Sequence, residues 1–340
     1  MTLDGKPPII IGHRGASAVR PEHTLASYRV AVEQGADYME PDLVPTRDGV
    51  LVARHENEIS GTTNVTTLPQ FAGRKATKTI DGAEVTGWFT EDFTLAELKT
   101  LRARERIPAI RPANTAFNDQ FDIPTLQEII DLAKALSAES GRSIGIYPET
   151  KHPSYFAGIG LPLEKSLVDT LHANGWRDRT APIFIQSFEV ANLKQLRGMT
   201  DLRLIQLIND SGRPFDFTLA GDSRSYGELV TETGLKEIAT YADGIGPSKA
   251  LVIPRDGSGR LAAPTRLVDW AHDAGLAVHL WTFRPENEFL PMDFRRATAT
   301  GSFLHQDHGD GTAEIRRFLE TGIDGFFTDL PAAGKAALQP

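Results

Sequence analysis

PIIIGHRG (residues 8–15) joins a short apolar run to two ionisable side chains that lie between glycines. The isoleucines are typical of a buried β-strand, and an ionisable group at the end of such a strand is costly unless it is paired or used. His13 and Arg14 therefore mark the carboxyl end of this strand as a candidate functional site. The fold around that site is predicted by the similar strand-like runs that follow along the chain.

Strand-like runs recur along the 340 residues, with amphipathic helical segments between most of them. One such segment, residues 125–141, ends at a glycine, which readily adopts the left-handed conformation of a helix C-terminus. About eight strand–helix alternations in a chain of this length predict a TIM (β/α)8 barrel. The strand-like runs are residues 8–12, 38–44, 50–55, 143–149, 182–188, 202–208, 242–247, 276–283 and 324–329.

Residues from about 57 to 122 interrupt the alternation. This segment is rich in Thr, Gly, Arg and Lys. It contains one helix-like run, residues 94–103, in which Thr94 and Glu97 are placed to form a capping box. We therefore expect a single domain over residues 1–340, with an insertion after the second strand rather than a separate second domain.

Composition limits the classes of partner. The formal net charge of −9 disfavours nucleic acid, because a negative surface repels a phosphate backbone. No apolar run reaches the roughly 18 residues that a membrane-spanning helix needs. Without cysteine the chain can form neither disulfides nor thiolate metal sites. An anionic small molecule would therefore need a metal ion or a few well-placed cations in order to bind.

In a barrel of this kind, chemistry takes place at the carboxyl ends of the strands. Several residues there are spaced two apart, so the two side chains of each pair point the same way from an extended strand. We expect each pair to face the barrel mouth. The pairs are Glu40 and Asp42, Glu149 and Lys151, Gln186 and Phe188, and Trp281 and Phe283.

Glu40, Asp42 and Glu149 would bring three carboxylates to that mouth. Packed together without a counter-charge, these groups repel one another strongly. A divalent cation removes the repulsion, and an all-oxygen ligand set suits Ca²⁺ or Mg²⁺ better than zinc. The alternative is that the carboxylates form salt bridges with Lys151 and Arg14.

Two histidines, His13 and His55, follow strand-like runs near these carboxylates. Because imidazole gains and loses a proton near neutral pH, a pair of histidines can serve as general acid and general base. The remaining histidines have no comparable context and are interpreted as structural: His23, His152, His172, His272, His279, His305 and His308.

The motifs form an ordered series: GHRG (12–15), PEHTL (21–25), YMEPDLV (38–44), VARHE (52–56), IGIYPETK (144–151), IQSF (185–188), YADGIGP (241–247), WTF (281–283) and GFFTDLP (325–331). In this order they resemble the glycerophosphodiester phosphodiesterase family from residue 9 to about 331, except through the insertion. The insertion and the PEHTL and YADGIGP segments make the chain most similar to the extracytoplasmic, calcium-dependent bacterial branch. The resemblance implies a TIM barrel that hydrolyses glycerophosphodiesters to sn-glycerol 3-phosphate and an alcohol.

The resemblance also implies roles for individual residues. His13 and His55 match the acid–base pair of the family. The substrate-binding positions are Arg14 and Lys151 at the phosphate, Trp281 near the glycerol, and Gln186 and Phe188 in the pocket wall. The metal ligands are Glu40, Asp42 and Glu149, which would hold one divalent cation, Ca²⁺ rather than Mg²⁺.

Two local features accompany this assignment. Glu56 stands where the family usually has an aspartate, so a longer carboxylate would have to orient His55. Gly12 and Gly15 are expected to let the backbone approach the ligand closely.

Three alternatives remain open at this stage. The first is a related phosphodiesterase of phospholipase D-like specificity, which the polar insertion disfavours. The second is a non-catalytic binding protein on the same fold. The third is a sugar hydrolase that uses Glu40 and Asp42, although two carboxylates on one side of a strand do not flank a bond. The residues are compatible with attack on phosphorus by the glycerol hydroxyl, through a cyclic intermediate, or by water.

The resemblance to the extracytoplasmic branch predicts the location of the protein. We expect the native protein to be exported, periplasmic or secreted, with a signal sequence that this chain lacks. A cytoplasmic enzyme is the alternative.

Overall fold

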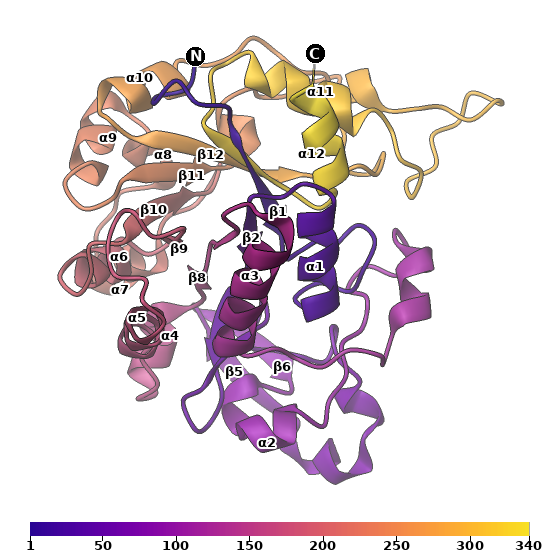
Figure 1. The fold of residues 1–340 in the computed structure, drawn as a ribbon, viewed down its shortest axis with the longest axis vertical. Helices are drawn as coiled ribbons and strands as arrows, with labels where there is room; N and C mark the ends of the chain where they lie inside the picture. The colour runs from indigo at the N-terminus through magenta and orange to yellow at the C-terminus, as the bar shows by residue number, and fades with distance from the viewer. Residues whose placement is uncertain (340) are drawn as a thin grey trace.

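The computed structural model describes residues 1–339 and has the predicted TIM-barrel fold (Figure 1). Within that range, parallel pairings run in order around the ring, and the ring closes where the last strand pairs with the first and the first with the second. The strands are β1 (Ile9–His13), β2 (Tyr38–Glu40) continued by β3 (Asp42–Pro45), β7 (Gly145–Ile146) continued by β8 (Glu149–Thr150), β9 (Phe184–Ser187), β10 (Arg203–Ile208), β11 (Gly244–Pro247), β12 (Ala277–Phe283) and β13 (Gly325–Thr328).

Two strands are interrupted by proline, which cannot donate a ladder hydrogen bond. Pro41 separates β2 from β3, and Pro148 separates β7 from β8. The carbonyls of both prolines still accept bonds from the next strand, from Glu149 N and Gln186 N respectively, each at 2.9 Å. The barrel therefore stays closed through both interruptions.

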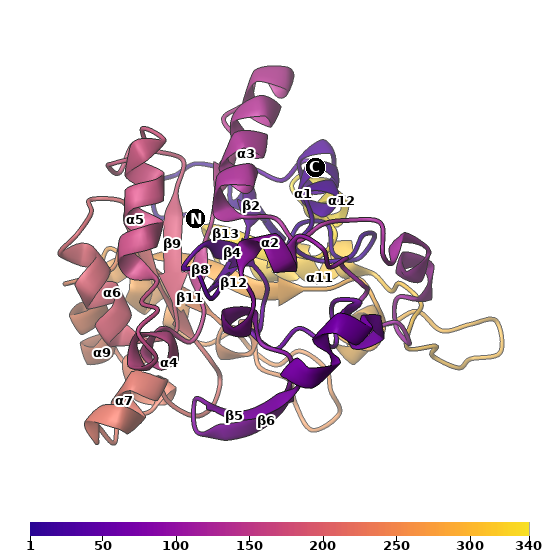
Figure 2. The same cartoon turned by 90° about the horizontal axis from the view of Figure 1, so that it is seen from below.

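Helices cover the outside of the barrel. Figure 2 shows the strands between α5 and α6 on one side and α1 and α12 on the other. Among residues 1–339, no helix has the length and apolar character needed to cross a bilayer. The helices are α1 (Leu25–Glu33), α2 (Leu95–Leu98), α3 (Leu126–Ser140), α4 (Pro153–Gly158), α5 (Glu164–Ala173), α6 (Val190–Arg197), α7 (Phe215–Ala220), α8 (Tyr226–Leu229), α9 (Glu232–Ile238), α10 (Leu267–Asp273), α11 (Gly311–Leu319) and α12 (Pro331–Ala337).

Helix α3 shows how local sequence sets the element boundaries. Its N-cap Thr125 accepts a bond from Glu128 N, and the Glu128 side chain bonds back to the N-cap backbone. Its C-cap Gly141 is left-handed, with φ of +66°. The buried face of α3 packs into the main core between the helices and the strands, and it includes Ile129, Ile130 and Ala133.

A second, smaller core fills the inside of the barrel below the mouth. It consists of Ile11, Tyr147, Phe184, Ile205 and Phe327, which all come from the strands or from the residues that link them. Because these side chains fill the lumen, the mouth is the end at which polar residues can gather around a cavity.

The run 50–55 is not a barrel strand, and the interpretation of His55 as a barrel-strand end is wrong. Its ordered part, β4 (Leu51–Ala53), pairs antiparallel with β3, beyond the barrel. A tight turn causes the reversal, with Gly49 N bonded to Thr46 O and φ of +77° at Gly49. His55 therefore reaches the mouth from a loop that follows β4.

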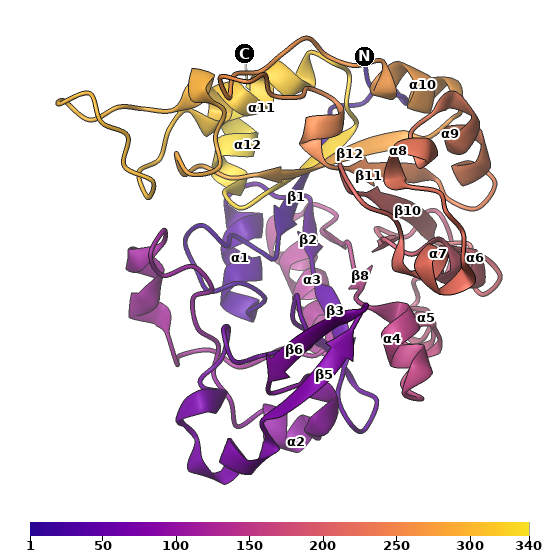
Figure 3. The ribbon, with the colours of Figure 1, turned by 180° about the vertical axis from the view of Figure 1, so that it is seen from behind.

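Residues 57–122 run from the end of the molecule opposite α11 and α12 (Figures 1 and 3) back to the barrel mouth, where Arg111 bonds Asp329. They contain the hairpin of β5 (Ala76–Ile80) and β6 (Ala83–Gly87), helix α2 and several short 3₁₀ turns. The capping box of Thr94 and Glu97 forms as predicted, but α2 ends at Leu98 and not near residue 103. The chain leaves the helix there because Ala103 pairs with Thr63 as an isolated bridge.

Gly12 and Gly15 are required to be small by packing, in addition to the close approach to a ligand that the sequence suggested. A Cβ on Gly12 would lie 2.8 Å from Ala31 Cβ, and one on Gly15 would lie 2.4 Å from Ser27 Oγ. Both contacts are with α1. These glycines make room for the helix that packs behind the strand.

Gly15→Ala is therefore expected to destabilise the fold by about 1–3 kcal/mol or more through overpacking, in addition to the strain of its left-handed backbone. Gly141→Ala is the matched control, since Gly141 is also left-handed but has open space at its Cβ position. Chemical unfolding of both variants measures the difference. Equal losses would mean that backbone strain, and not contact with Ser27, sets the requirement for glycine.

Candidate active site

A cavity of about 270 Å³ opens at the carboxyl ends of the barrel strands. Lys151, although predicted to belong to the same site, lines a neighbouring cavity of about 440 Å³ together with Glu149 and Phe188. The central cavity brings together the other predicted residues: His13, Arg14, Glu40, Asp42, His55, Glu149, Gln186, Phe188 and Trp281, with Leu207, Thr282, Arg284 and Phe327 beside them.

The three carboxylates meet as the sequence predicted. Glu40, Asp42 and Glu149 are all buried, and each offers an oxygen within 4.8 Å of the others. Glu40 ends β2 and Asp42 begins β3, so Pro41 at the break leaves both on the cavity side. The pairing of β3 with β8 sets Asp42 directly beside Glu149.

The electrostatics of this triad favour a cation. Burial, and then the neighbouring carboxylates, raise the pKa of Glu40 well above its usual range, and burial raises the pKa of Glu149 to about 8. Burial also opposes ionisation of Asp42, but the charge of Lys151 and a hydrogen bond with His23 hold the pKa of Asp42 well below its usual range. Among residues 1–339, the buried Asp42 Oδ1 has no hydrogen-bond partner. These residues fit one hard divalent cation, with an acceptor oxygen free to bind it.

The alternative salt bridges are present but incomplete. Lys151 Nζ lies 2.8 Å from Glu149 Oε1, and Arg14 Nε lies 3.4 Å from Asp42 Oδ2. Arg14 also pairs with Glu22 at 3.1 Å. Arg106 also pairs with Glu22, which leaves Lys151 and the shared Arg14 for the three carboxylates of the triad. The salt bridges therefore do not neutralise the triad.

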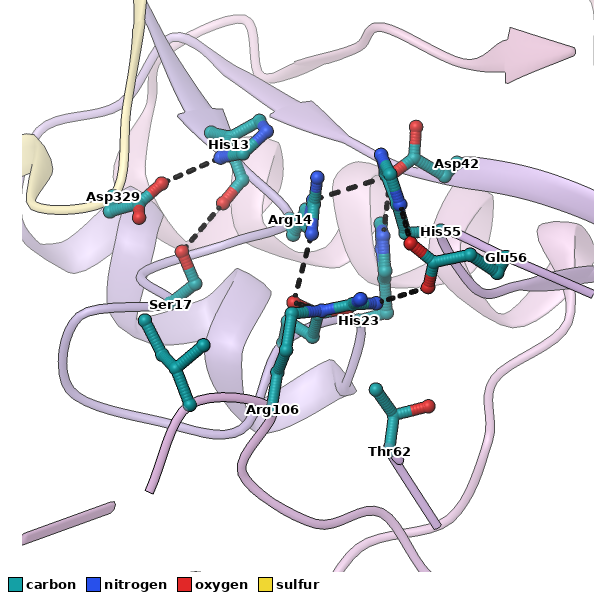
Figure 4. Close-up of polar contacts among 12 residues, drawn as sticks. His13, Arg14, Ser17, His23, Asp42, His55, Glu56, Thr62, Arg106 and Asp329 are labelled. Atoms are coloured by element: carbon teal, nitrogen blue, oxygen red, sulfur yellow. Dashed lines mark hydrogen bonds and ion pairs between the residues drawn. The ribbon is translucent and has the colours of Figure 1, made fainter. Parts of the chain in front are cut away.

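Each candidate acid–base histidine is held by a carboxylate on its Nδ1 (Figure 4). His13 Nδ1 lies 2.6 Å from Asp329 Oδ1, and His55 Nδ1 pairs closely with Glu56 Oε1. In both cases Nε2 is the remaining ring nitrogen. Although glutamate is longer than the aspartate expected at position 56, Glu56 still places a carboxylate oxygen on His55 Nδ1.

The surroundings of both imidazoles favour the neutral form at neutral pH. Burial and the positive charge of Arg14 lower the pKa of His13 to about 4, against the opposing effect of Asp329. Partial burial, Arg14 and Lys151 lower the pKa of His55 to about 3. An anion bound beside Arg14 would offset these cations and favour the protonated form of either histidine.

Arg14 is positioned by its own backbone. Its φ of +57° is left-handed, and its N–H donates to Glu40 Oε2 at 2.8 Å. The strand thus ends in a turn that aims a backbone donor at the triad and the guanidinium along the cavity wall. This geometry explains the adjacency of His13 and Arg14 in the sequence.

Aromatic and amide groups form the remaining wall. The rings of Phe188 and Trp281 meet edge to face with centroids 5.9 Å apart. Gln186 donates to Glu40 Oε1 at 3.2 Å, whereas its buried Oε1 has no partner among the described residues. Phe283, predicted to face the mouth with Trp281, instead packs against Phe318 and Phe326, because the strand register shifts between Leu280 and Phe283.

Several site residues escaped the sequence analysis. His23, interpreted as structural, is fully buried and lies with Nε2 2.8 Å from Asp42 Oδ2, so it fixes a member of the triad. Its place in the PEHTL motif was the available signal. Asp329 had the same kind of signal, its place in the GFFTDLP motif, whereas the insertion residues Arg106 and Arg111 carried none, because their partners are distant in sequence.

Comparison with known proteins agrees with the fold and identifies the family. The chain is 35% identical to a glycerophosphodiester phosphodiesterase of Arabidopsis thaliana over 96% of its own length and 85% of the relative. It is 29% identical to a glycerophosphodiester phosphodiesterase of Haemophilus influenzae over 96% of its own length and 88% of that protein.

Solved structures share the same fold. A glycerophosphoryl diester phosphodiesterase from Silicibacter pomeroyi matches with a TM-score of 0.67 and 23% identity, covering 99% of this chain and 95% of that one. An Oleispira antarctica phosphodiesterase, solved in complex with the product sn-glycerol-3-phosphate, matches with a TM-score of 0.61 and 18% identity, covering 99% of each chain. The model of the glycerophosphoryl diester phosphodiesterase family matches residues 13–333. The chain therefore belongs to this family and is a phosphodiesterase of that class.

Proposed function

We propose that this enzyme hydrolyses glycerophosphodiesters to sn-glycerol 3-phosphate and an alcohol, with His13 and His55 as the acid–base pair and one divalent cation held by Glu40, Asp42 and Glu149. The observation that carries the proposal is that two carboxylate-backed imidazoles, Arg14 and the triad line one cavity of about 270 Å³. The product complex of the Oleispira antarctica enzyme supports the product assignment.

The substrate phosphate would lie against Arg14, whose guanidinium neutralises phosphoryl oxygens as the charge on them grows. Lys151 adds a second positive charge from the adjoining cavity. A bound divalent cation would supply Lewis-acid stabilisation of the same oxygens. Negative charge arriving in this cavity would otherwise meet the carboxylates of the triad.

The histidines would move the protons. With each Nδ1 held by a carboxylate, Nε2 is the atom available to take a proton from the nucleophile or to give one to the departing alkoxide. Asp329 and Glu56 fix the tautomer and stabilise the imidazolium that forms, as an orienting carboxylate does in a catalytic triad.

The glycerol end would contact the wall formed by Trp281, Phe188 and Gln186. The unpartnered Oε1 of Gln186 can accept a bond from a glycerol hydroxyl, and the aromatic edges can cover the carbon chain. This division of the cavity leaves the alcohol group of the diester at its open side.

A coupled assay for released glycerol 3-phosphate tests the reaction on a panel of glycerophosphodiesters with choline, ethanolamine or glycerol as the alcohol. We expect release from at least one diester, with far slower cleavage of lysophosphatidylcholine and sphingomyelin. Preference for the lipids would favour the phospholipase D-like alternative. Binding of glycerophosphodiesters without any turnover would favour the non-catalytic one.

We further propose that the enzyme belongs to the calcium-dependent, extracytoplasmic branch of the family. Ca²⁺ accepts six to eight oxygens in flexible geometry, which suits a triad completed by water and substrate oxygens. Stronger activation by Mg²⁺ than by Ca²⁺ at equal concentration would count against this branch. Fractionation of cells that express the full reading frame tests export to the periplasm or medium, and recovery in the cytoplasm would contradict it.

A further inference from the structure

Each carboxylate that holds a candidate catalytic histidine is itself held by an arginine, and both arginines come from one short stretch of the inserted segment. Arg111 Nη2 donates to Asp329 Oδ2 at 2.5 Å, and Asp329 Oδ1 faces His13 Nδ1. Arg106 Nη2 donates to Glu56 Oε2 at 2.7 Å, and Glu56 Oε1 faces His55 Nδ1. Two parallel chains of arginine, carboxylate and imidazole thus end at the same cavity.

The chain through Arg111 is buried. The side chain of Arg111 is only 6% exposed, and that of Asp329 only 3%. Arg111 also donates from Nε to Glu286 Oε1 at 2.6 Å and from Nη1 to Ser17 O at 2.9 Å. A guanidinium with three different acceptors has a fixed orientation, so it fixes the carboxylate behind His13.

The chain of Arg106, Glu56 and His55 is more exposed. The position of Glu56 therefore depends more on its bond to Arg106. The side chains of His55 and Glu56 are 30% and 37% exposed. Glu56 has a longer, more flexible side chain than aspartate, and Arg106 holds its far oxygen. Arg106 is anchored in turn by two bonds to Glu22, of 2.8 and 2.6 Å.

Local hydrogen bonds hold the stretch that carries both arginines in a fixed shape. Glu105 accepts bonds from Ile107 N at 2.9 Å and from Asn114 Nδ2 at 2.8 Å. Arg111 N donates to Ile107 O at 2.9 Å, which closes a turn between the two arginines. These bonds fix Arg106 and Arg111 relative to each other.

We propose that Arg106 and Arg111 are positioning residues through which the inserted segment 57–122 orients the two catalytic histidines. The inference rests on the proposed acid–base function of His13 and His55. A planar guanidinium suits this role because it can bond two acceptors at fixed angles, which the single ammonium of lysine does less well. In this proposal the inserted segment has a direct role in positioning the catalytic groups.

The test measures kcat and KM for Arg106→Met and Arg111→Met. Arg104→Met is the matched control, because Arg104 belongs to the same stretch but pairs with the exposed Asp119. Since misplacing a catalytic group by about 1 Å costs about 100-fold, we expect a fall in kcat of about 10–100-fold for the two variants and near-normal kcat for Arg104→Met. KM is expected to change by less than about threefold, as for an interaction made chiefly in the transition state.

The His55→Ala background separates positioning from a merely structural effect. If Arg106 acts through His55, Arg106→Met has no further effect on kcat once the imidazole is gone. An equal fall in both backgrounds, or a fall no larger than that of Arg104→Met, would overturn the proposal. Full turnover by His55→Ala itself would instead overturn the proposed function.

Arg111 is buried, so Arg111→Met is accompanied by Arg111→Lys, which keeps the charge. We expect Arg111→Lys to fold, as measured by its thermal midpoint, and to regain part of the lost kcat. We also expect added guanidinium ion to raise the kcat of Arg106→Ala but not that of Arg104→Ala. Wild-type kcat in a folded Arg111→Lys together with no rescue of Arg106→Ala would contradict the role assigned to the guanidinium groups.

Discussion

His13→Ala and His55→Ala are each expected to lower kcat by about 10²–10⁴-fold, the usual contribution of a group that transfers a proton in the transition state. Both imidazoles line the cavity beside the triad, and each presents Nε2 while a carboxylate holds Nδ1. Removing either ring leaves a proton of the nucleophile or of the leaving alkoxide without a partner. Steady-state kinetics on a cleaved glycerophosphodiester measure the loss.

His305→Ala is the control for this pair. His305 also has a carboxylate partner, Glu288, but its side chain is 69% exposed and it does not line the cavity. We expect wild-type kcat for this variant and similar thermal midpoints for all three. Near-normal turnover in His13→Ala or His55→Ala, with an unchanged midpoint, would remove that histidine from the mechanism.

Glu40→Gln and Glu149→Gln are each expected to weaken Ca²⁺ binding by at least about 10–100-fold and to lower activity accordingly, because even the groups behind metal ligands contribute that much. The substitution keeps the shape of the side chain but removes the charge that attracts the cation. Because burial and neighbouring carboxylates disfavour the ionised form of Glu40, its neutral replacement also removes repulsion, and we expect little loss of stability.

Titration calorimetry with Ca²⁺ measures the affinity, and thermal unfolding measures stability in the absence of metal. Glu139→Gln is the control, since Glu139 lies on α3 with its side chain 55% exposed and pairs with Arg29. Equal Ca²⁺ affinity in Glu149→Gln, Glu139→Gln and the wild-type protein would place the cation outside the triad.

The barrel and much of its mouth could be predicted because local sequence determines them. The alternation of strands and helices defines the fold, and residues two apart on a strand share a face whatever the rest of the chain does. The pairing of neighbouring strands in register is therefore enough to bring Glu40 and Asp42 next to Glu149. Capping boxes such as Thr94 with Glu97 are equally local, so they form as predicted.

The parts that were missed depend on contacts between distant residues. Asp329 lies 316 positions from His13, and Arg111 lies 218 positions from Asp329. No periodicity within one segment carries such a pairing. Phe283 shows the converse case, because a register shift in β12 against β13 breaks the alternation that local reasoning assumes.

The same limit applies to the run 50–55. Its composition is that of a barrel strand, but the turn at Gly49 folds β4 back on β3 and sends His55 to the mouth from outside the ring. A strand pattern indicates an extended segment, whereas its partner and direction depend on the turn that precedes it.

The central claim is that hydrolysis at this cavity depends on a cation held by Glu40, Asp42 and Glu149. The most direct measurement is glycerol 3-phosphate release by the wild-type enzyme after exhaustive chelation, followed by titration with Ca²⁺ or Mg²⁺. The account predicts that the chelated enzyme is inactive and that Ca²⁺ restores activity better than Mg²⁺ at equal concentration. Turnover at the full rate by the metal-free enzyme would contradict it.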